Sequence, residues 1–276
     1  MAGKQVTTHY RDGLTQRVIL ATQHLHRHSK HKLIEHLIAY AALTRIGEMF
    51  FLNPATGVLA SGIKILFIGN SLTYTNNLPA LVQEIGKQDS VTIHYKSLSF
   101  PNYSFEDHWN EGAIQKEIEE GKYHFVIAQQ GPSAMPESQV LLIEYAKKLS
   151  EWCKKYNTSL CFFTVWPSKA RSFDHDGVIT SYKKAAEQTR SLLAPAGLAW
   201  KQAWKTNPEF ALYGLDDFHP STAGSLLAAM TIYATLKQKD NFDFLHSRDA
   251  SWKDEATDSQ LKIFKLAALK ALNSSF

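Results

Sequence analysis

The sequence predicts an α/β fold in which a parallel sheet lies between two layers of helices. From residue 63 onward, β-type runs alternate with segments that have helical apolar periodicity. The runs that end before Gly69 and Gln129 are almost uninterruptedly apolar, which is typical of strands covered on both faces. Each helical segment meets Gly, Asn or Pro at its end. Strand followed by helix, repeated along the chain, therefore favours a three-layer α/β/α domain.

Five segments are candidate strands of this sheet, because they are rich in β-branched and aromatic residues. They are residues 63–69, 91–100, 123–130, 159–166 and 198–204. Helices are expected between them over residues 78–88, 113–122, 140–156 and 178–197. Two further helices follow, over 221–237 and 259–272, and Ser221 or Thr222 is expected to cap the first of them.

The first sixty residues differ in composition from the rest of the chain. They are basic and rich in histidine, and residues 31–48 have the periodicity of an amphipathic helix. The spacing from His24 to His31 could suit a transition metal, but no cysteine or carboxylate set accompanies it, which favours a solvated arm and no metal site. We therefore predict a basic arm over residues 1–60 and an α/β domain over residues 61–276.

Composition limits the partners of this chain. Lys and Arg number 30 against 26 Asp and Glu, and much of the basic charge falls in the first fifty residues, so no nucleic-acid surface is indicated. No run approaches the roughly 20 apolar residues of a membrane helix, which predicts no integral membrane segment. The opening residues lack the order of a secretory signal, which favours a cytoplasmic protein unless the true start differs. Cys161 reads as a small buried hydrophobe.

The stretch KILFIGNSLTYTNN, residues 64–77, places Ser71 directly after the first predicted strand. In open parallel sheets, active sites form beyond the carboxyl ends of the strands. Backbone N–H groups at a helix start can stabilise an anion there, which suits a serine nucleophile. Position alone equally suits a serine that only caps a helix.

A second loop, GLDDFHPSTAG over residues 214–224, supplies a partner for this serine. Asp216 and His219 are three residues apart, so one turn can bring the carboxylate to the imidazole Nδ1 and leave Nε2 facing a serine. A serine hydroxyl needs such a base to be a nucleophile, and the base needs an orienting group. Ser71, His219 and Asp216 together therefore indicate a catalytic triad.

On these two blocks the chain resembles the SGNH, or GDSL-type, hydrolases, which are esterases and acyl-hydrolases of flavodoxin-like fold. Gly69-Asn70-Ser71-Leu72 is similar to their Gly-Asp-Ser-Leu, and residues 216–220 to their Asp-x-x-His-Pro. The resemblance spans about residues 63–237 and implies the strand order 2-1-3-4-5. It implies Ser71 as nucleophile, His219 as general base and acid, and Asp216, rather than Asp217, as the orienting carboxylate.

The two middle blocks of the family are matched less closely. Asn102 stands where the family has an oxyanion-hole glycine, and Gln130, in a Gln-Gly pair similar to that of carbohydrate-directed members, stands for the asparagine donor. The resemblance thus implies an oxyanion hole of Ser71 N–H, Asn102 N–H and the Gln130 amide, with Gln129 and Ser133 as rivals of Gln130. Further candidates for the pocket are Asn70, His108 and Trp166.

The sequence thus predicts a serine esterase that cleaves small acyl esters, carbohydrate O-deacetylation included, without a cofactor or metal. Its expected partner is a small-molecule or carbohydrate ester. A catalytically inactive glycan-binding module on the same fold is the alternative. A phosphate-binding flavodoxin-like protein is disfavoured because neither GxGxxG nor GxxxxGK[ST] occurs. Acyl transfer to a sugar hydroxyl would use the same residues as hydrolysis.

Overall fold

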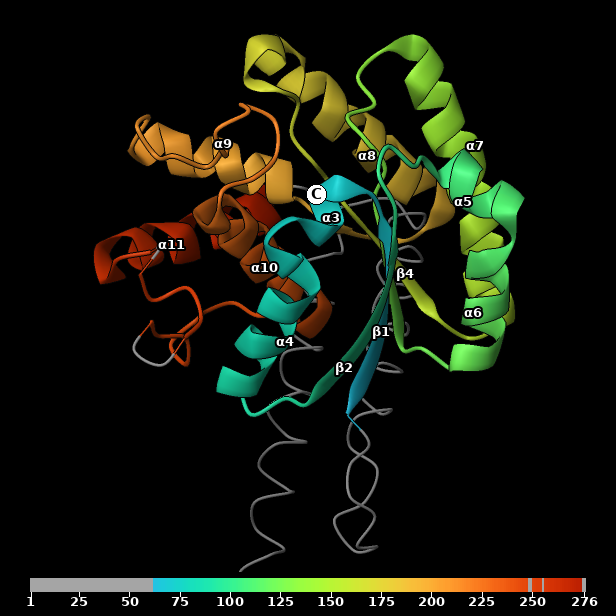
Figure 1. Ribbon diagram of the computed structural model, residues 1–276, viewed down its shortest axis with the longest axis horizontal. Helices are drawn as coiled ribbons and strands as arrows, with labels where there is room; N and C mark the ends of the chain where they lie inside the picture. The colour runs from blue at the N-terminus through green and yellow to red at the C-terminus, as the bar shows by residue number, and fades with distance from the viewer. Residues whose placement is uncertain (1–61, 248–249, 255, 275–276) are drawn as a thin grey trace, which may run out of the picture. The chain divides into compact units, whose positions relative to one another are not determined.

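A five-stranded parallel sheet forms the middle layer of the domain (Figure 1). The computed structural model describes residues 62–247, 250–254 and 256–274, so the predictions for the arm at residues 1–60 lie outside it. The strands are β1 (Ile63–Gly69), β2 (Ile93–Ser99), β3 (Phe125–Ala128), β4 (Ser159–Phe163) and β5 (Leu192–Ala194). Their order is β2-β1-β3-β4-β5 and every neighbouring pair is parallel. The predicted fold class and strand order are confirmed.

Helices cover both faces of this sheet, as Figure 1 shows. On one side lie α4 (Leu78–Gln88) and α10 (Thr222–Lys237), with α9 (Ala196–Thr206) and α11 (Asp258–Ser274) packed beside α10. On the other side lie α5 (Phe105–Glu111), α6 (Ala113–Gly121), α7 (Pro136–Lys155) and α8 (His175–Thr189). None of the helices in the described part of the chain is long and apolar enough to cross a membrane.

The central strands are buried on both faces because helices cover each side. Residues 65–68 of β1 and 126–128 of β3 have no exposed surface. Such continuous burial explains why their sequences are apolar without alternation. Cys161 on β4 is equally buried, and this burial raises the pKa of its thiol to about 12. Its role as a small buried hydrophobe is confirmed.

The predicted position of the fifth strand is wrong. Residues 198–204, expected as a strand, lie in α9, and the strand is formed by Leu192–Ala194, which the sequence placed in a helix. The buried apolar positions of α9 include Ala196, Ala199, Trp200 and Ala203, the i, i+3, i+4, i+7 spacing of a helix face. A three-residue strand is too short to show any periodicity of its own.

Helix α10 begins as predicted, with Ser221 as its cap. The Ser221 hydroxyl accepts a hydrogen bond from the backbone N–H of Gly224 at 3.1 Å. The helix is buried almost all round, because α4, α9 and α11 surround it. This burial anchors the start of α10, which directly follows the loop that carries His219.

The carboxyl ends of the strands define the edge where the predicted site residues lie. In the register of the sheet, Gly69 of β1 faces Ser99 of β2, and Ile68 faces Ala128 of β3. The loops after β1, β2 and β3 therefore start side by side at one edge. This arrangement is the topological switch point at which open α/β sheets form their sites.

Candidate active site

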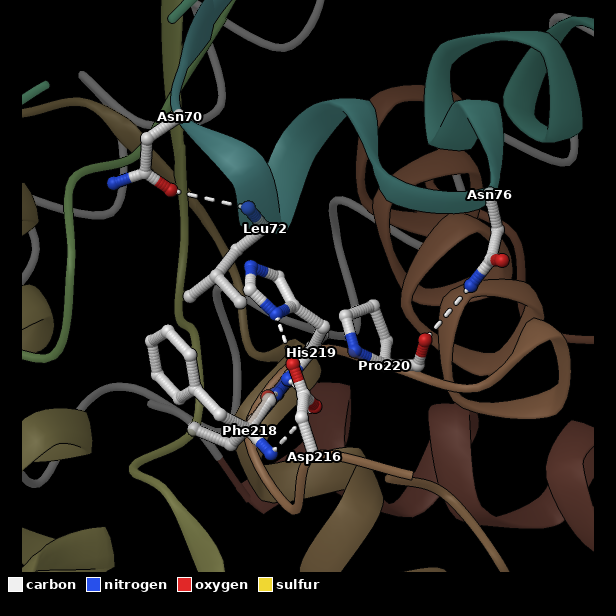
Figure 2. Close-up of polar contacts among 8 residues, drawn as sticks. Asn70, Leu72, Asn76, Asp216, Phe218, His219 and Pro220 are labelled. Atoms are coloured by element: carbon white, nitrogen blue, oxygen red, sulfur yellow. Dashed lines mark hydrogen bonds and ion pairs between the residues drawn. The ribbon is translucent and has the colours of Figure 1, made fainter. Parts of the chain in front are cut away.

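Ser71 starts a short helix at the end of β1. Asn70 is the N-cap of α3 (Ser71–Tyr74): its Oδ1 accepts a hydrogen bond from the backbone N–H of Leu72 at 3.1 Å (Figure 2). The cap is therefore Asn70, and the reading of Ser71 as a mere capping residue is wrong. The hydroxyl of Ser71 makes no hydrogen bond within the described ranges, and the residue is half-buried at the sheet edge.

Asp216 makes three hydrogen bonds, two to His219 and one to its neighbour Phe218. Its Oδ2 lies 2.5 Å from His219 Nδ1, and its Oδ1 accepts the backbone N–H groups of His219 at 2.9 Å and Phe218 at 3.1 Å. These bonds lower the pKa of Asp216 to about 2, that from the imidazole most of all. An ionised carboxylate at Nδ1 makes that nitrogen the donor and leaves Nε2 as the acceptor, which a general base requires.

Asp217 points elsewhere, although it adjoins Asp216 in the sequence. Its backbone is left-handed, with φ at 56°, and its carboxylate lies 3.1 Å from Lys169 Nζ. The left-handed turn sends the two neighbouring carboxylates in different directions. The structure therefore brings Asp216, and not Asp217, to the imidazole, as the resemblance implied.

The loops that carry Ser71 and His219 are joined to each other. Asn76, five residues after Ser71, donates from Nδ2 to the carbonyl oxygen of Pro220 at 2.9 Å (Figure 2). In that view the second nitrogen of the His219 ring is turned away from Asp216 and toward the α3 turn. No hydrogen bond links the Ser71 hydroxyl to His219 Nε2 in the described chain; such contacts are often long until substrate binds.

The loop after β2 is tied to the β1 and β3 loops. Asn102 has φ at 63°, a left-handed conformation that glycine adopts most easily, which fits the glycine position that the sequence assigned to it. The carbonyl oxygen of Tyr103 accepts a hydrogen bond from Asn70 Nδ2 at 3.0 Å. The N–H of Phe105 donates to Gln130 Oε1 at 3.1 Å. These ties hold the Asn102 backbone next to the Ser71 turn.

The three rival oxyanion donors differ in their free hydrogen atoms. Gln129 uses both side-chain N–H groups, on Asn70 Oδ1 at 2.8 Å and Thr73 Oγ1 at 2.9 Å. Ser133 donates its hydroxyl hydrogen to the carbonyl oxygen of Gly131 at 3.1 Å. Gln130 donates one N–H to Ser133 Oγ at 2.9 Å and keeps the other. Within this set, Gln130 alone has a side-chain N–H to spare.

His108 and Trp166, which the sequence suggested as pocket residues, are buried. His108 is buried, and its Nε2 donates to the carbonyl oxygen of Gly69 at 2.8 Å; burial lowers its pKa. Trp166 has no exposed surface, stacks on Trp200 at 3.6 Å between ring centroids, and donates from Nε1 to the carbonyl oxygen of Phe218 at 3.1 Å. Both side chains support the ends of site loops from beneath and line no open pocket.

A cavity of about 420 Å³ opens beside the His219 loop. Its walls come from the loops after β3 and β4, the start of α7, and Phe218, the neighbour of His219. Most of its surface is apolar, and an ion pair between Arg171 and Asp174, with 2.5 Å between the charged atoms, lies at its edge. The lining residues are Pro132, Ala134, Met135, Glu137, Ser138, Pro167, Ser168, Arg171, Asp174 and Phe218.

Sequence reasoning missed two residues that shape the site. Asn76 could have been suspected, because the pair Asn76-Asn77 is a turn signal and both residues have left-handed φ angles. Tyr182 on α8 carried no signal: its buried hydroxyl accepts the Gln130 N–H at 2.9 Å and donates to the Gln130 carbonyl oxygen at 2.5 Å. Only the packing of α8 against α7, β4 and β5 brings it there.

Solved structures share this architecture. A DUF4886 family protein from Bacteroides uniformis aligns with a TM-score of 0.64 at 18% identity, over 77% of this chain and 95% of that chain. A candidate SGNH hydrolase from Slackia heliotrinireducens has a TM-score of 0.55 at 23% identity, over 64% and 100%. A lipase/acylhydrolase from Enterococcus faecalis has a TM-score of 0.52 at 14% identity, over 64% and 96%.

These likenesses define the class of fold as a doubly wound α/β domain. Within that class, the chain has the fold of an SGNH hydrolase. No family model matches the sequence, and no curated protein matches it. Fold alone does not establish an activity, which has to be argued from the site.

Proposed function

We propose that this protein is a serine-dependent ester hydrolase of SGNH type that cleaves small acyl esters through an acyl-enzyme. The observation that carries the proposal is the His219–Asp216 pair, 2.5 Å apart, on the same sheet edge as Ser71. The hydrogen bond from Asn76 to Pro220 supports it, because it ties the two loops together. The fold shared with an SGNH hydrolase and a lipase/acylhydrolase is a further, weaker support.

In the proposed reaction, His219 Nε2 takes the hydroxyl proton of Ser71 as the Ser71 oxygen attacks the ester carbonyl carbon. Asp216, ionised because its pKa is lowered to about 2, stabilises the resulting imidazolium. The imidazolium then gives its proton to the leaving alcohol, and an acyl-enzyme remains. Water activated by His219 releases the acid and restores Ser71.

Hydrogen-bond donors from three loops would stabilise the negative charge on the oxygen of the tetrahedral intermediate. Ser71 is the first residue of α3, and N–H groups of a first helical turn have no partner within the helix, so its N–H is available. Asn102 N–H and the spare N–H of Gln130 would complete the oxyanion hole. Tyr182 holds the Gln130 backbone at both its N–H and its carbonyl group, which favours a fixed donor.

The cavity beside Phe218 favours a small substrate. A volume of about 420 Å³ with mainly apolar walls suits a short acyl or compact alcohol group. Deacetylation of carbohydrate is the finer proposal and rests on the Gln130-Gly131 pair alone. Trp166 gives it no support, because a ring without exposed surface cannot stack on a sugar.

Hydrolysis of p-nitrophenyl acetate and butyrate by the wild type and by Ser71→Ala tests the function, with acetylated xylan as a second substrate. We expect the variant to lose activity and to keep its thermal midpoint, because a half-buried hydroxyl at the sheet edge contributes little packing. Equal rates in both proteins, at equal purity, would refute Ser71 as the nucleophile. The glycan-binding module would then be the better hypothesis, and binding of xylan without cleavage would support it.

A further inference from the structure

The side-chain amide of Asn70 joins three loops of the site. Its Oδ1 accepts hydrogen bonds from Leu72 N–H at 3.1 Å and from Gln129 Nε2 at 2.8 Å. Its Nδ2 donates to the carbonyl oxygen of Tyr103 at 3.0 Å. Asn70 itself is only 6% exposed, so water competes little for these bonds. One buried amide thus links the Ser71 turn to the β2 and β3 loops.

Gln129 orients this amide. It has no exposed surface and donates both Nε2 hydrogens, to Asn70 Oδ1 and to Thr73 Oγ1. Its own Oε1 is buried and has no hydrogen-bond partner among the described residues. A buried acceptor without a partner destabilises a fold, and an apolar side chain would avoid that cost. A glutamine at residue 129 is therefore explained by the two hydrogen bonds that its N–H groups donate to Asn70 and Thr73.

The space around this pair is closed. A Cβ on Gly69 would lie 2.3 Å from Thr73 Oγ1 and 2.7 Å from Gln129 Nε2. Only glycine at the end of β1 leaves room for the two side chains to meet the turn. The polar cluster thus depends on three consecutive residues at the end of the strand: Gly69, which has no side chain, then Asn70 with its amide, then Ser71.

We propose that Asn70 and Gln129 are a positioning pair. They fix the Ser71 N–H and the Asn102 loop relative to each other, so that both can donate to the oxyanion. The inference rests on the proposed function and deepens it. The pair requires an amide at residue 70, where the family commonly has aspartate, because a carboxylate has no N–H to donate to the Tyr103 carbonyl oxygen. The positioning pair acts on the transition state and the tetrahedral intermediate, since the bound ester itself carries no oxyanion.

The test compares Gln129→Met and Asn70→Asp with the wild type, by kcat and KM on p-nitrophenyl acetate and by thermal midpoint. We expect kcat to fall about 10- to 100-fold in each variant, because a misplacement of about 1 Å costs that much, while KM changes little. Because the two residues act as one unit, the double variant should be no slower than Asn70→Asp alone.

Gln115→Met is the matched control. Gln115 also has a buried Oε1 without a partner in the described chain, but its Nε2 donates to the carbonyl oxygen of Trp109 at 2.8 Å, on the α6 side of the fold. Its kcat should equal that of the wild type, whatever happens to the thermal midpoint. If Gln115→Met loses as much kcat as Gln129→Met, the loss in both variants reflects general destabilisation, and the inference is overturned.

The outcomes separate the inference from the function on which it rests. A wild type that hydrolyses the ester, with Gln129→Met and Asn70→Asp within about twofold of its kcat, overturns the positioning pair alone. A wild type that neither hydrolyses the ester nor is phosphonylated at Ser71 by a p-nitrophenyl phosphonate ester, with release of p-nitrophenol, overturns both proposals. If Gln129→Met does not fold, the near-isosteric Asn70→Asp decides the question by itself.

Discussion

The Asn70–Ser71 turn and the Asp216–His219 loop carry the two halves of the proposed triad, and they are held in different ways. Asn70 is 6% exposed and is fixed by buried amide groups. The side chains of Asp216 and His219 are 54% and 35% exposed, and backbone carbonyl oxygens of the loop that carries them accept hydrogen bonds from Asn76, Trp166 and Lys169. The turn that carries the nucleophile is anchored by buried side chains, whereas the base lies on a surface loop.

This difference predicts how the two regions respond to substitution. Buried hydrogen bonds are strong and costly to leave unpaired, so changes near Ser71 should alter stability and rate together. Exposed polar contacts contribute little to the free energy of unfolding, so changes in the His219 loop should alter the rate alone. Substitutions at Asp216, Gln130 and Asn76 test this difference.

Asp216→Asn should lower kcat/KM by roughly a thousandfold or more, because the amide no longer fixes the tautomer or stabilises the imidazolium. The thermal midpoint at pH 7 should change little, since the side chain is exposed. Ester hydrolysis and thermal unfolding measured on one preparation check both statements. Asp217→Asn, which breaks only an exposed ion pair with Lys169, is the control and should keep wild-type activity.

The pH profile gives a second readout of the same residue. A lowered pKa of about 2 means that the small contribution of this exposed carboxylate to stability is present above its usual pKa of 3.8 and is lost as pH falls toward 2. Between pH 4 and 8 its charge stays constant, so the acid limb of kcat/KM has to come from another group. A wild-type thermal midpoint that falls no more than that of Asp216→Asn between pH 4 and pH 2 would contradict the lowered pKa of Asp216.

Gln130→Ala should lower kcat by roughly ten- to a thousandfold, as expected for the loss of one oxyanion donor. The variant also removes the acceptor of the Phe105 N–H, so its thermal midpoint should fall as well. Gln130→Glu separates the two effects, because it keeps an acceptor oxygen and loses the N–H groups. A normal rate in Gln130→Glu would exclude the side-chain amide as a donor.

Asn76→Ala should have the smallest effect, a loss of roughly tenfold or less in kcat, because it removes the tie between the two loops but none of the reacting groups. Asn76 donates to the Pro220 carbonyl oxygen at 2.9 Å and to Ser225 Oγ at 3.0 Å. Asn157→Ala is the control: Asn157 has the same φ of 54°, outside the site, so the two variants share the backbone penalty. Equal kinetics in both variants would show that the tie is dispensable.

Much of the fold could be predicted because it depends on local patterns. Continuous burial of β1 and β3 left an unbroken apolar run in each, and the Ser221 cap of α10 followed from residue type. The fifth strand could not be predicted, since three residues carry no period and α9 has apolar residues that also suit a strand. Its place was decided by pairing with β4.

For the candidate site, the available chemistry could be predicted from the sequence: a serine after the first strand, a carboxylate three residues before a histidine, and two adjacent glutamines. These are local spacings, which can be recognised without knowledge of the fold. Which glutamine keeps a free N–H, and the burial of Trp166 and His108 beneath the site loops, became apparent only in the folded structure. These outcomes depend on contacts between segments distant in the sequence, such as Gln129 with Asn70, and no local pattern encodes where such partners will lie.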